Sequence, residues 1–225
     1  MPAAGAEYAS GIQAIHDDNW IKATEHFQKA VDLDPSMAAA HLRLSMTNAA
    51  GDRAVRRAEF ETTAGLRSQL SPRDQALMLA LQPFLQGATQ DIPETDRRLQ
   101  ALIPRYPTDV ELLMWLGLIH MDAPENLPTA ERALALDPED AQSWEIKGRA
   151  LLTAGNVLDA RDAFERCSKL SVDGADCFAY LSVADSLAGR CADFEADARR
   201  AADREASYGI FVLRAMVSAG AEPMR

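Results

Sequence analysis

Apolar residues along this chain recur at steps of three and four, the period of an amphipathic helix, and do not alternate in steps of two as in a strand. The pattern runs from Tyr8 to His16, breaks at three polar residues, and returns from Trp20 to Leu33. Pro35 then ends it, because proline suits the first turn of the next helix and cannot continue the previous one. The same succession continues to the C-terminal tail and predicts thirteen helices and no strand.

Four positions of the first helical pair return 137 residues later with the same internal steps of 12, 4 and 3. The two sets are Gly11, Ala23, Phe27 and Ala30, and Gly148, Ala160, Phe164 and Cys167. Four periods of about 34 residues come within one residue of this spacing, and self-similarity at that period is typical of helix-turn-helix repeat arrays. The repeat therefore predicts an all-α fold, a solenoid of helical hairpins.

Breaks in the pattern divide the chain into six hairpins and a terminal helix. Their expected bounds are 4–35, 36–70, 71–107, 108–138, 139–173 and 174–205, with the terminal helix at 206–220. The fourth hairpin is short, because Pro107 to Pro138 and Gly117 to Gly148 are each 31 residues apart. Since a repeat array distributes its core along its length, we expect a single elongated repeat domain over residues 1–225.

The residues at the recurring positions resemble the motif of the tetratricopeptide repeat family. Six positions of the motif are fitted by Trp144, Gly148, Leu151, Ala160, Phe164 and Cys167, and five by Gly11, Ala23, Phe27, Ala30 and Pro35. The other units match the motif poorly, and we count them as repeats because they lie in register with it. The resemblance implies a right-handed superhelix and a non-catalytic module whose concave groove binds a protein or peptide, since the motif residues themselves are structural.

In that family the first helix of each hairpin lines the groove, so the resemblance also implies which residues face a ligand. The corresponding positions are Tyr8, Ile12, Leu42, Met46, Leu77, Leu81, Met114, Leu118, Met121, Glu145, Arg149 and Leu152. In the first four units they are mostly apolar and include several methionines, which suits an amphipathic helix or an apolar peptide. The alternative is that they pack inside a tightly wound superhelix, and the sequence leaves both open.

Some members of the family grip a C-terminal carboxylate with Lys, Asn and Arg side chains in the groove. Tyr8, Ile12 and Leu42 do not match that clamp, and Arg43 alone does not supply it. We therefore expect a different specificity.

A narrower resemblance concerns residues 70–77, 106–109 and 177–191, which are similar to repeat regions attached to bacterial serine/threonine kinases and transcriptional regulators. It implies, as the alternative function, a sensory or self-association arm of a larger bacterial signalling protein. The chain shows no kinase glycine-rich loop, no HRD or DFG triplet and no DNA-reading helix. Because a further helix would follow Gly220 in such an array, we expect one module of a longer protein.

Charge and hydropathy narrow the range of partners. The formal net charge is −11, whereas nucleic-acid-binding surfaces need clustered lysine and arginine, so we expect no nucleic-acid partner. The most apolar run, Leu112 to Met121, is about half of the roughly 18 residues that a membrane span requires, and we expect no membrane insertion by this segment. With no secretory pattern at the N-terminus, we expect a cytoplasmic protein, or a periplasmic one if it is attached to a membrane-anchored protein.

Candidate catalytic chemistry is sparse in this sequence. The four histidines are scattered and form no HExxH or Cys/His set; they are His16, His26, His41 and His120. No GxSxG, P-loop or GxGxxG motif occurs. We therefore expect no metal, no cofactor and no enzymatic activity.

The three cysteines lie in the C-terminal third, and their odd number leaves at least one thiol unpaired within the chain. Cys167 stands where the first hairpin has Ala30, a small packed position, so we expect a buried thiol there. Cys177 begins the next helix and could approach Cys167. A disulfide between these two is the alternative that the sequence leaves open, with Cys191 at the opposite end of that hairpin.

Overall fold

The computed structural model describes residues 2–47, 52–87, 89–120, 122–171 and 173–205. Within these ranges it contains twelve α-helices, two short 3-10 helices and no strand. The all-α solenoid architecture expected from the repeat is therefore confirmed. The terminal helix expected at 206–220 lies outside the described residues.

The helices group into two compact units, one of Met1–Ile15 and Trp20–Ile119 and the other of His16–Asn19 and His120–Arg225. The first unit holds α1 (Pro2–His16, except its last residue), α2 (Trp20–Leu33), α3 (Ala38–Thr47), α4 (Arg53–Gly65), α5 (Pro72–Leu85), α6 (Ile92–Leu102) and α7 (Val110–Ile119). The second holds α8 (Leu127–Leu136), α9 (Ala141–Thr153), α10 (Val157–Leu170), α11 (Asp176–Leu187) and α12 (Cys191–Arg204). That residues 1–225 form one repeat domain stays a prediction.

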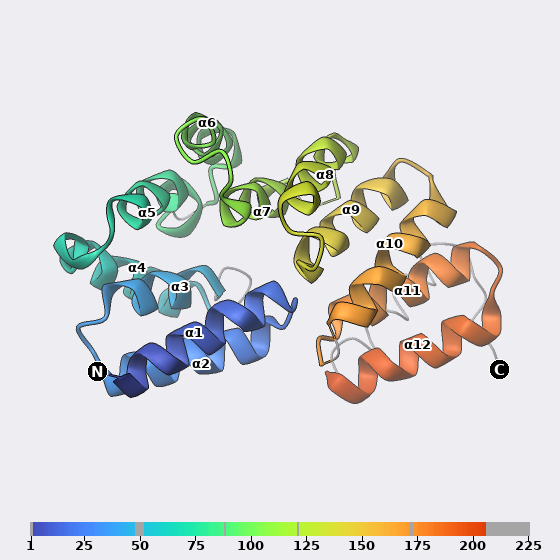
Figure 1. Cartoon of the computed structure of the whole chain (residues 1–225), viewed down its shortest axis with the longest axis horizontal. Coiled ribbons are helices and arrows are strands. Elements are labelled where there is room, and N and C mark those ends of the chain that lie inside the picture. The colour runs from blue at the N-terminus through green and yellow to red at the C-terminus, as the bar shows by residue number, and fades with distance from the viewer. Residues whose placement is uncertain (1, 48–51, 88, 121, 172, 206–225) are drawn as a thin grey trace. The chain divides into compact units, whose positions relative to one another are not determined.

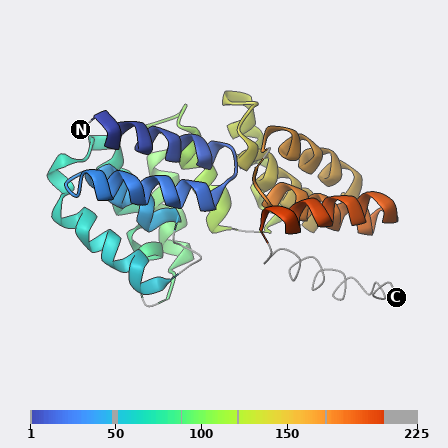
Figure 2. The same ribbon diagram turned by 90° about the horizontal axis from the view of Figure 1, so that it is seen from below.

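Consecutive helices pack as hairpins. In the first unit α3 packs against α4 and α5 against α6, and in the second α9 packs against α10 and α11 against α12 (Figure 1). Figure 2 shows α1 and α2 lying side by side in the same manner. Neighbouring hairpins touch through α2 and α3 and through α10 and α11. Because α7 and α8 belong to different units, the expected division of the chain into six hairpins stays a prediction.

Local chemistry sets where the helices begin. Ser71 precedes α5 and accepts a hydrogen bond from the amide of Asp74 at 3.0 Å, while Pro72 occupies the first helical position. Asp140 caps α9 in the same way by accepting from the amide of Ser143 at 3.0 Å. These caps satisfy amides that have no partner inside the helix.

A glycine packs against a phenylalanine ring in both the first and the fifth hairpin. A Cβ atom on Gly11 would lie 2.6 Å from Phe27 Cε1, and one on Gly148 would lie 2.6 Å from Phe164 Cδ1. Both phenylalanines are fully buried, so a residue larger than glycine would force the ring to move. The two hairpins therefore make the same contact with the same residue types.

The remaining recurring positions are mostly small and packed. Ala23, Ala30, Ala160 and Cys167 are fully buried, Gly117 is buried, Trp144 is half-buried, and Pro35 and Pro138 are exposed in the turns after α2 and α8. The indole nitrogen of Trp144 donates to the carbonyl oxygen of Pro138 at 2.9 Å, which ties α9 to the turn before it.

Candidate functional site

The structure separates the residues expected to line the groove into buried and accessible groups. The apolar ones that are buried, with 3% or less of their surface exposed, are Leu42, Met46, Leu77, Leu81 and Met114. Those that keep some surface are Tyr8, Leu118 and Leu152, which are half-buried, and Ile12, which is 37% exposed. Met121 lies outside the described residues. These five buried residues pack in the interior, as the alternative expected. That the candidate groove residues bind a ligand stays a prediction.

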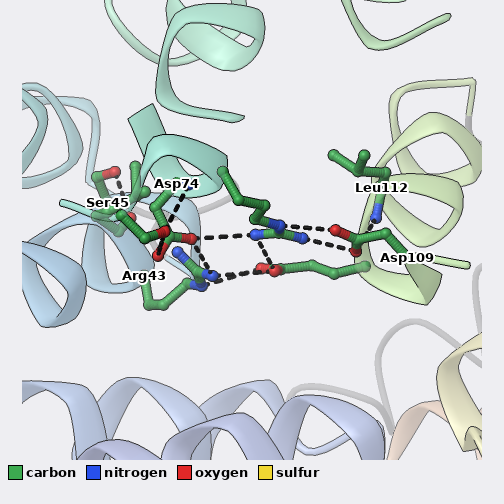
Figure 3. A network of polar contacts seen from close by, with 9 residues as sticks. Arg43, Ser45, Asp74, Asp109 and Leu112 are labelled. Carbon is green, nitrogen blue, oxygen red and sulfur yellow. Dashed lines mark hydrogen bonds and ion pairs between the residues drawn. The ribbon is translucent and has the colours of Figure 1, made fainter. Parts of the chain in front are cut away.

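A cluster of charged side chains joins three successive hairpins of the first unit (Figure 3). Arg43 of α3 contacts Asp74 of α5 and Glu111 of α7, each at 2.9 Å. Arg73 of α5 holds Asp109 through two hydrogen bonds of 2.7 Å and contacts Glu111 at 2.6 Å. We call these five residues the Arg43 network. Its bonds connect the second, third and fourth hairpins by charge-assisted contacts, which are stronger than neutral hydrogen bonds.

Helix starts supply the carboxylates of the Arg43 network. Asp74 lies in the first turn of α5 and Glu111 in the first turn of α7, where the helix dipole favours negative charge. Asp109 precedes α7, and its carboxylate also accepts from the amide of Leu112 at 3.3 Å (Figure 3). Each of the three acids therefore lies at the start of a helix. Each also binds an arginine, either from a neighbouring hairpin or from the same hairpin. From the sequence alone these residues look like ordinary helix starts.

Burial and ion pairing have opposite effects on the pKa values of Arg43 and Asp74, and ion pairing has the larger effect. Burial of Arg43, whose side chain is 4% exposed, acts to lower its pKa, but Glu111 and other neighbours raise the pKa above its usual value. Burial likewise acts to raise the pKa of Asp74, but Arg43 lowers it below its usual value. Tyr8 of α1 lies within the field of these charges, and its pKa is raised chiefly because it is partly buried. Arg43 and Asp74 are therefore both charged at neutral pH.

The Arg43 network holds more carboxylates than guanidinium groups. It contains two guanidinium groups and three carboxylates, and both guanidinium groups already contact carboxylates. A further carboxylate would meet this excess of negative charge. That the chain differs in specificity from the carboxylate clamp stays a prediction, and this charge balance agrees with it. The side chains of Arg73, Asp109 and Glu111 remain about one-fifth exposed, so the edge of the network reaches solvent.

The second unit contains a related cluster on α9. Arg149 and Glu145, both expected in the groove, are buried and bind each other at 2.8 Å. Arg149 also contacts Asp122 at 2.8 Å, and its guanidinium carbon lies 4.7 Å from the ring centroid of Tyr180 on α11. Burial acts to lower the pKa of Arg149, but Glu145 and the other partners raise it. The structure therefore brings two predicted residues together with Asp122, which the sequence did not single out.

A cavity of about 430 Å³ between α10, α11 and α12 was not expected from the sequence. Phe178 forms part of its wall, and the guanidinium carbon of Arg204 lies 4.2 Å from the centroid of that ring. Arg200 pairs with Asp197 at 2.8 Å at its edge. The sequence of α12 has acidic and basic residues at steps of three and four, a pattern that usually indicates a solvated helix face. The sequence of α12 therefore did not indicate a cavity.

Cys167 and Cys177 form a disulfide, which was the alternative that the sequence left open. The bond joins the last turn of α10 to the first turn of α11, and hence the fifth hairpin to the sixth. Cys191 is an exposed free thiol. Asp18, from the turn after α1, lies against the two sulfur atoms. No sequence pattern indicated that neighbour.

Comparison with known proteins supports the fold assignment. Residues 127–167 match the family model described as tetratricopeptide repeat. No curated protein matches the sequence. The resemblance to the tetratricopeptide repeat family is thereby confirmed for the α8–α10 region, and the solved structures extend it to the fold of the chain.

Three solved structures illustrate this likeness. A thermophilic tetratricopeptide-repeat protein of Thermus thermophilus has 15% identity over 96% of this chain and 100% of its own, with a TM-score of 0.51. A chain of the APC/C hetero-tetramer Cut9–Hcn1 has 19% identity and a TM-score of 0.59 over 95% of this chain and 42% of its own. Yeast Tom70 has 13% identity and a TM-score of 0.58 over 97% of this chain and 48% of its own. This chain thus spans less than half of the last two proteins, and identities this low establish the fold alone.

Among the residues described, no helix combines the length and the apolar character that a bilayer-spanning segment requires.

Proposed function

We propose that this chain, whose fold is that of tetratricopeptide-repeat proteins, is a non-catalytic module that binds a peptide or helical segment of another protein. The surface we assign to binding in the first unit consists of Tyr8 and Ile12 on α1 together with the solvent-exposed edge of the Arg43 network. The observation that carries the proposal is that these side chains stay accessible while most of the predicted apolar lining is buried.

The mixture of contacts on this surface suits a protein segment. Ile12 offers exposed apolar area, and Tyr8 adds an aromatic ring packed at 5.7 Å between centroids on Phe27, which fixes its position. Arg73 and Asp109 offer charged groups that are already oriented by their mutual hydrogen bonds. Rigid aromatic anchors beside oriented polar groups are the features that contribute most to affinity at protein interfaces.

Charge indicates what kind of segment binds. The chain carries a net charge of −11, and the Arg43 network has one more carboxylate than guanidinium group. An acidic ligand is therefore repelled both at long range and at the surface, whereas a neutral or basic segment is attracted. We expect the partner segment to be basic or uncharged, with an apolar residue that contacts Ile12.

Site-specific photo-crosslinking tests this assignment with a matched pair of positions. A benzophenone amino acid at Ile12 of α1 should form adducts with a partner protein, whereas the same group at Ile21 of α2 should not. The two positions are the same residue type in the same hairpin, and Ile21 is the more exposed, at 49% against 37%. Mass spectrometry of the crosslinked peptides identifies the contacting segment.

The outcomes separate this surface from other surfaces of the chain. A single partner captured at Ile12 and absent at Ile21 supports the proposal, and the captured segment should be neutral or basic. Equal capture at both positions would mean that adducts report exposure alone. Capture at Ile21 only would place binding on the second helix of the hairpin and reject the surface that we assign.

A further inference from the structure

Residues from three elements meet at one buried point of the second unit, and one of them is distant from the other two in the sequence. Asp18 belongs to the turn after α1, Cys167 to the last turn of α10, and Cys177 to the first turn of α11. One ligand-type atom from each residue lies within 4.8 Å of the other two. None of the three residues exposes more than 1% of its surface.

Backbone geometry holds Asp18 at this point. Its φ of 54° lies in the left-handed region, which aspartate and asparagine adopt more readily than most residues. Its carbonyl oxygen lies against Gly174, where a Cβ atom would be only 2.6 Å away. A side chain at position 174 would therefore push the turn away from the α10–α11 connection. The convergence of the three residues depends on these two local features.

The contacts of the sulfur atoms suit thiols that donate hydrogen bonds. Cys177 Sγ lies 3.2 Å from Asp18 Oδ2, and Cys167 Sγ lies 3.2 Å from the carbonyl oxygen of Ala141. In a disulfide neither sulfur carries a proton, so neither can donate to these oxygen atoms. In the reduced chain both can, and both can also act as metal ligands once they lose their protons.

We propose that the reduced chain binds a thiophilic divalent cation such as Zn²⁺ through Asp18, Cys167 and Cys177. Thiolate sulfur and carboxylate oxygen are both common zinc ligands, and two thiolates favour zinc over magnesium or calcium. Burying three anionic groups together is costly unless a cation compensates them, and a dication does so directly. The carbonyl oxygen of Ala141, beside Cys167, or a water molecule would complete the four ligands.

The disulfide and the metal site exclude each other because they use the same two sulfur atoms. A dithiol reductant supplies two electrons and two protons to the disulfide, yields two thiols, and is itself oxidised to a disulfide. Zn²⁺ then forms two Zn–S bonds, and two protons are released. The second unit thus has two alternative links between α10 and α11, one covalent under oxidising conditions and one metal-mediated under reducing conditions.

Cobalt titration of the full chain tests the site. Protein reduced with dithiothreitol and separated from it under nitrogen should bind one equivalent of Co²⁺ and develop a thiolate-to-cobalt charge-transfer band, and the oxidised protein should show no band. Cys191→Ser, which alters the exposed thiol, should bind like the wild type. Cys177→Ser should lose the band. Asp18→Asn keeps a residue that tolerates the left-handed backbone, and removing a direct ligand should weaken binding by at least about tenfold.

Alkylation of the wild-type chain keeps the test independent of how well the variants fold. In moderate urea, Zn²⁺ should slow alkylation of Cys167 and Cys177 and leave Cys191 unchanged. The proposal is overturned if the reduced wild type shows no charge-transfer band, if the band disappears with Cys191→Ser, or if Asp18→Asn binds as tightly as the wild type. Equal alkylation of Cys167 and Cys177 with and without Zn²⁺ would also overturn it.

Discussion

Replacing Phe164 with alanine should lower the free energy of unfolding of the second unit by about 3–5 kcal/mol. Phe164 is fully buried, its ring lies against Gly148, and it stacks on Tyr180 with 5.4 Å between ring centroids. Alanine would forfeit this burial and leave a cavity between α9, α10 and α11 that rigid helices fill only in part. Chemical denaturation followed by circular dichroism measures the loss.

Leu158→Ala in the same helix is the matched control for Phe164→Ala. Leu158 is 69% exposed, so its truncation should change the free energy of unfolding by no more than about 0.5 kcal/mol. In a repeat array each hairpin depends on its neighbours, so hydrogen exchange in Phe164→Ala should rise first in α9, α10 and α11. A loss of less than about 1 kcal/mol, or exchange that rises first in α3 and α4, would contradict this account of the hairpin core.

Replacing Arg43 with methionine should destabilise the first unit by about 3–5 kcal/mol, the cost of leaving buried charge uncompensated. Methionine preserves most of the packed volume of the side chain but removes the guanidinium group that lies between Asp74 and Glu111. The two carboxylates would then keep only Arg73 as a cation within the Arg43 network. Thermal and chemical denaturation of the full chain measure the effect.

Arg57→Met provides the control for Arg43→Met, because Arg57 lies on α4 of the same hairpin and forms an exposed pair with Glu61. Pairs of that kind contribute about 0.3–0.5 kcal/mol. Adding Asp74→Asn to Arg43→Met should recover part of the loss, since it removes one of the uncompensated carboxylates. If Arg43→Met costs no more than Arg57→Met, the network does not hold the hairpins together as described.

Helices and hairpins could be predicted from the sequence because their signals are local. Pro35 and the Ser71-Pro72 start mark helix boundaries through steric and capping rules that need no knowledge of distant residues. The pairing of Gly148 with Phe164 follows from a repeated spacing, and the structure shows the physical contact that requires it. Such features are encoded within one repeat and can be recognised there.

The division of groove positions into core and surface could not be predicted in the same way. Leu42 and Met46 lie on a first helix that is surrounded by neighbouring elements, and both are fully buried. Ile12 occupies the corresponding face of α1 and keeps 37% of its surface. Periodicity identifies the face of a helix, but how closely the next hairpins cover that face depends on packing across several repeats.

Long-range polar clusters were the least predictable part of the site. Asp18 is separated from Cys167 by 149 residues, and Arg43 from Glu111 by 68. A local sequence pattern therefore cannot show that either pair is in contact. Asp74 and Glu111 also act in the first turns of their helices, a role that by itself explains their residue types. Only the arrangement of successive hairpins shows that these acids meet arginine or cysteine side chains from elsewhere in the chain.

The central claim, that the chain binds a protein segment on the first helices of its hairpins, is tested most directly by hydrogen exchange with the partner captured at Ile12. In the complex, exchange should slow in α1, which carries Tyr8 and Ile12, and at the start of α7, which carries Glu111. Exchange in α2 and α4 should stay as in the free chain. Slower exchange confined to α2 and α4, or no change in α1, would contradict the account.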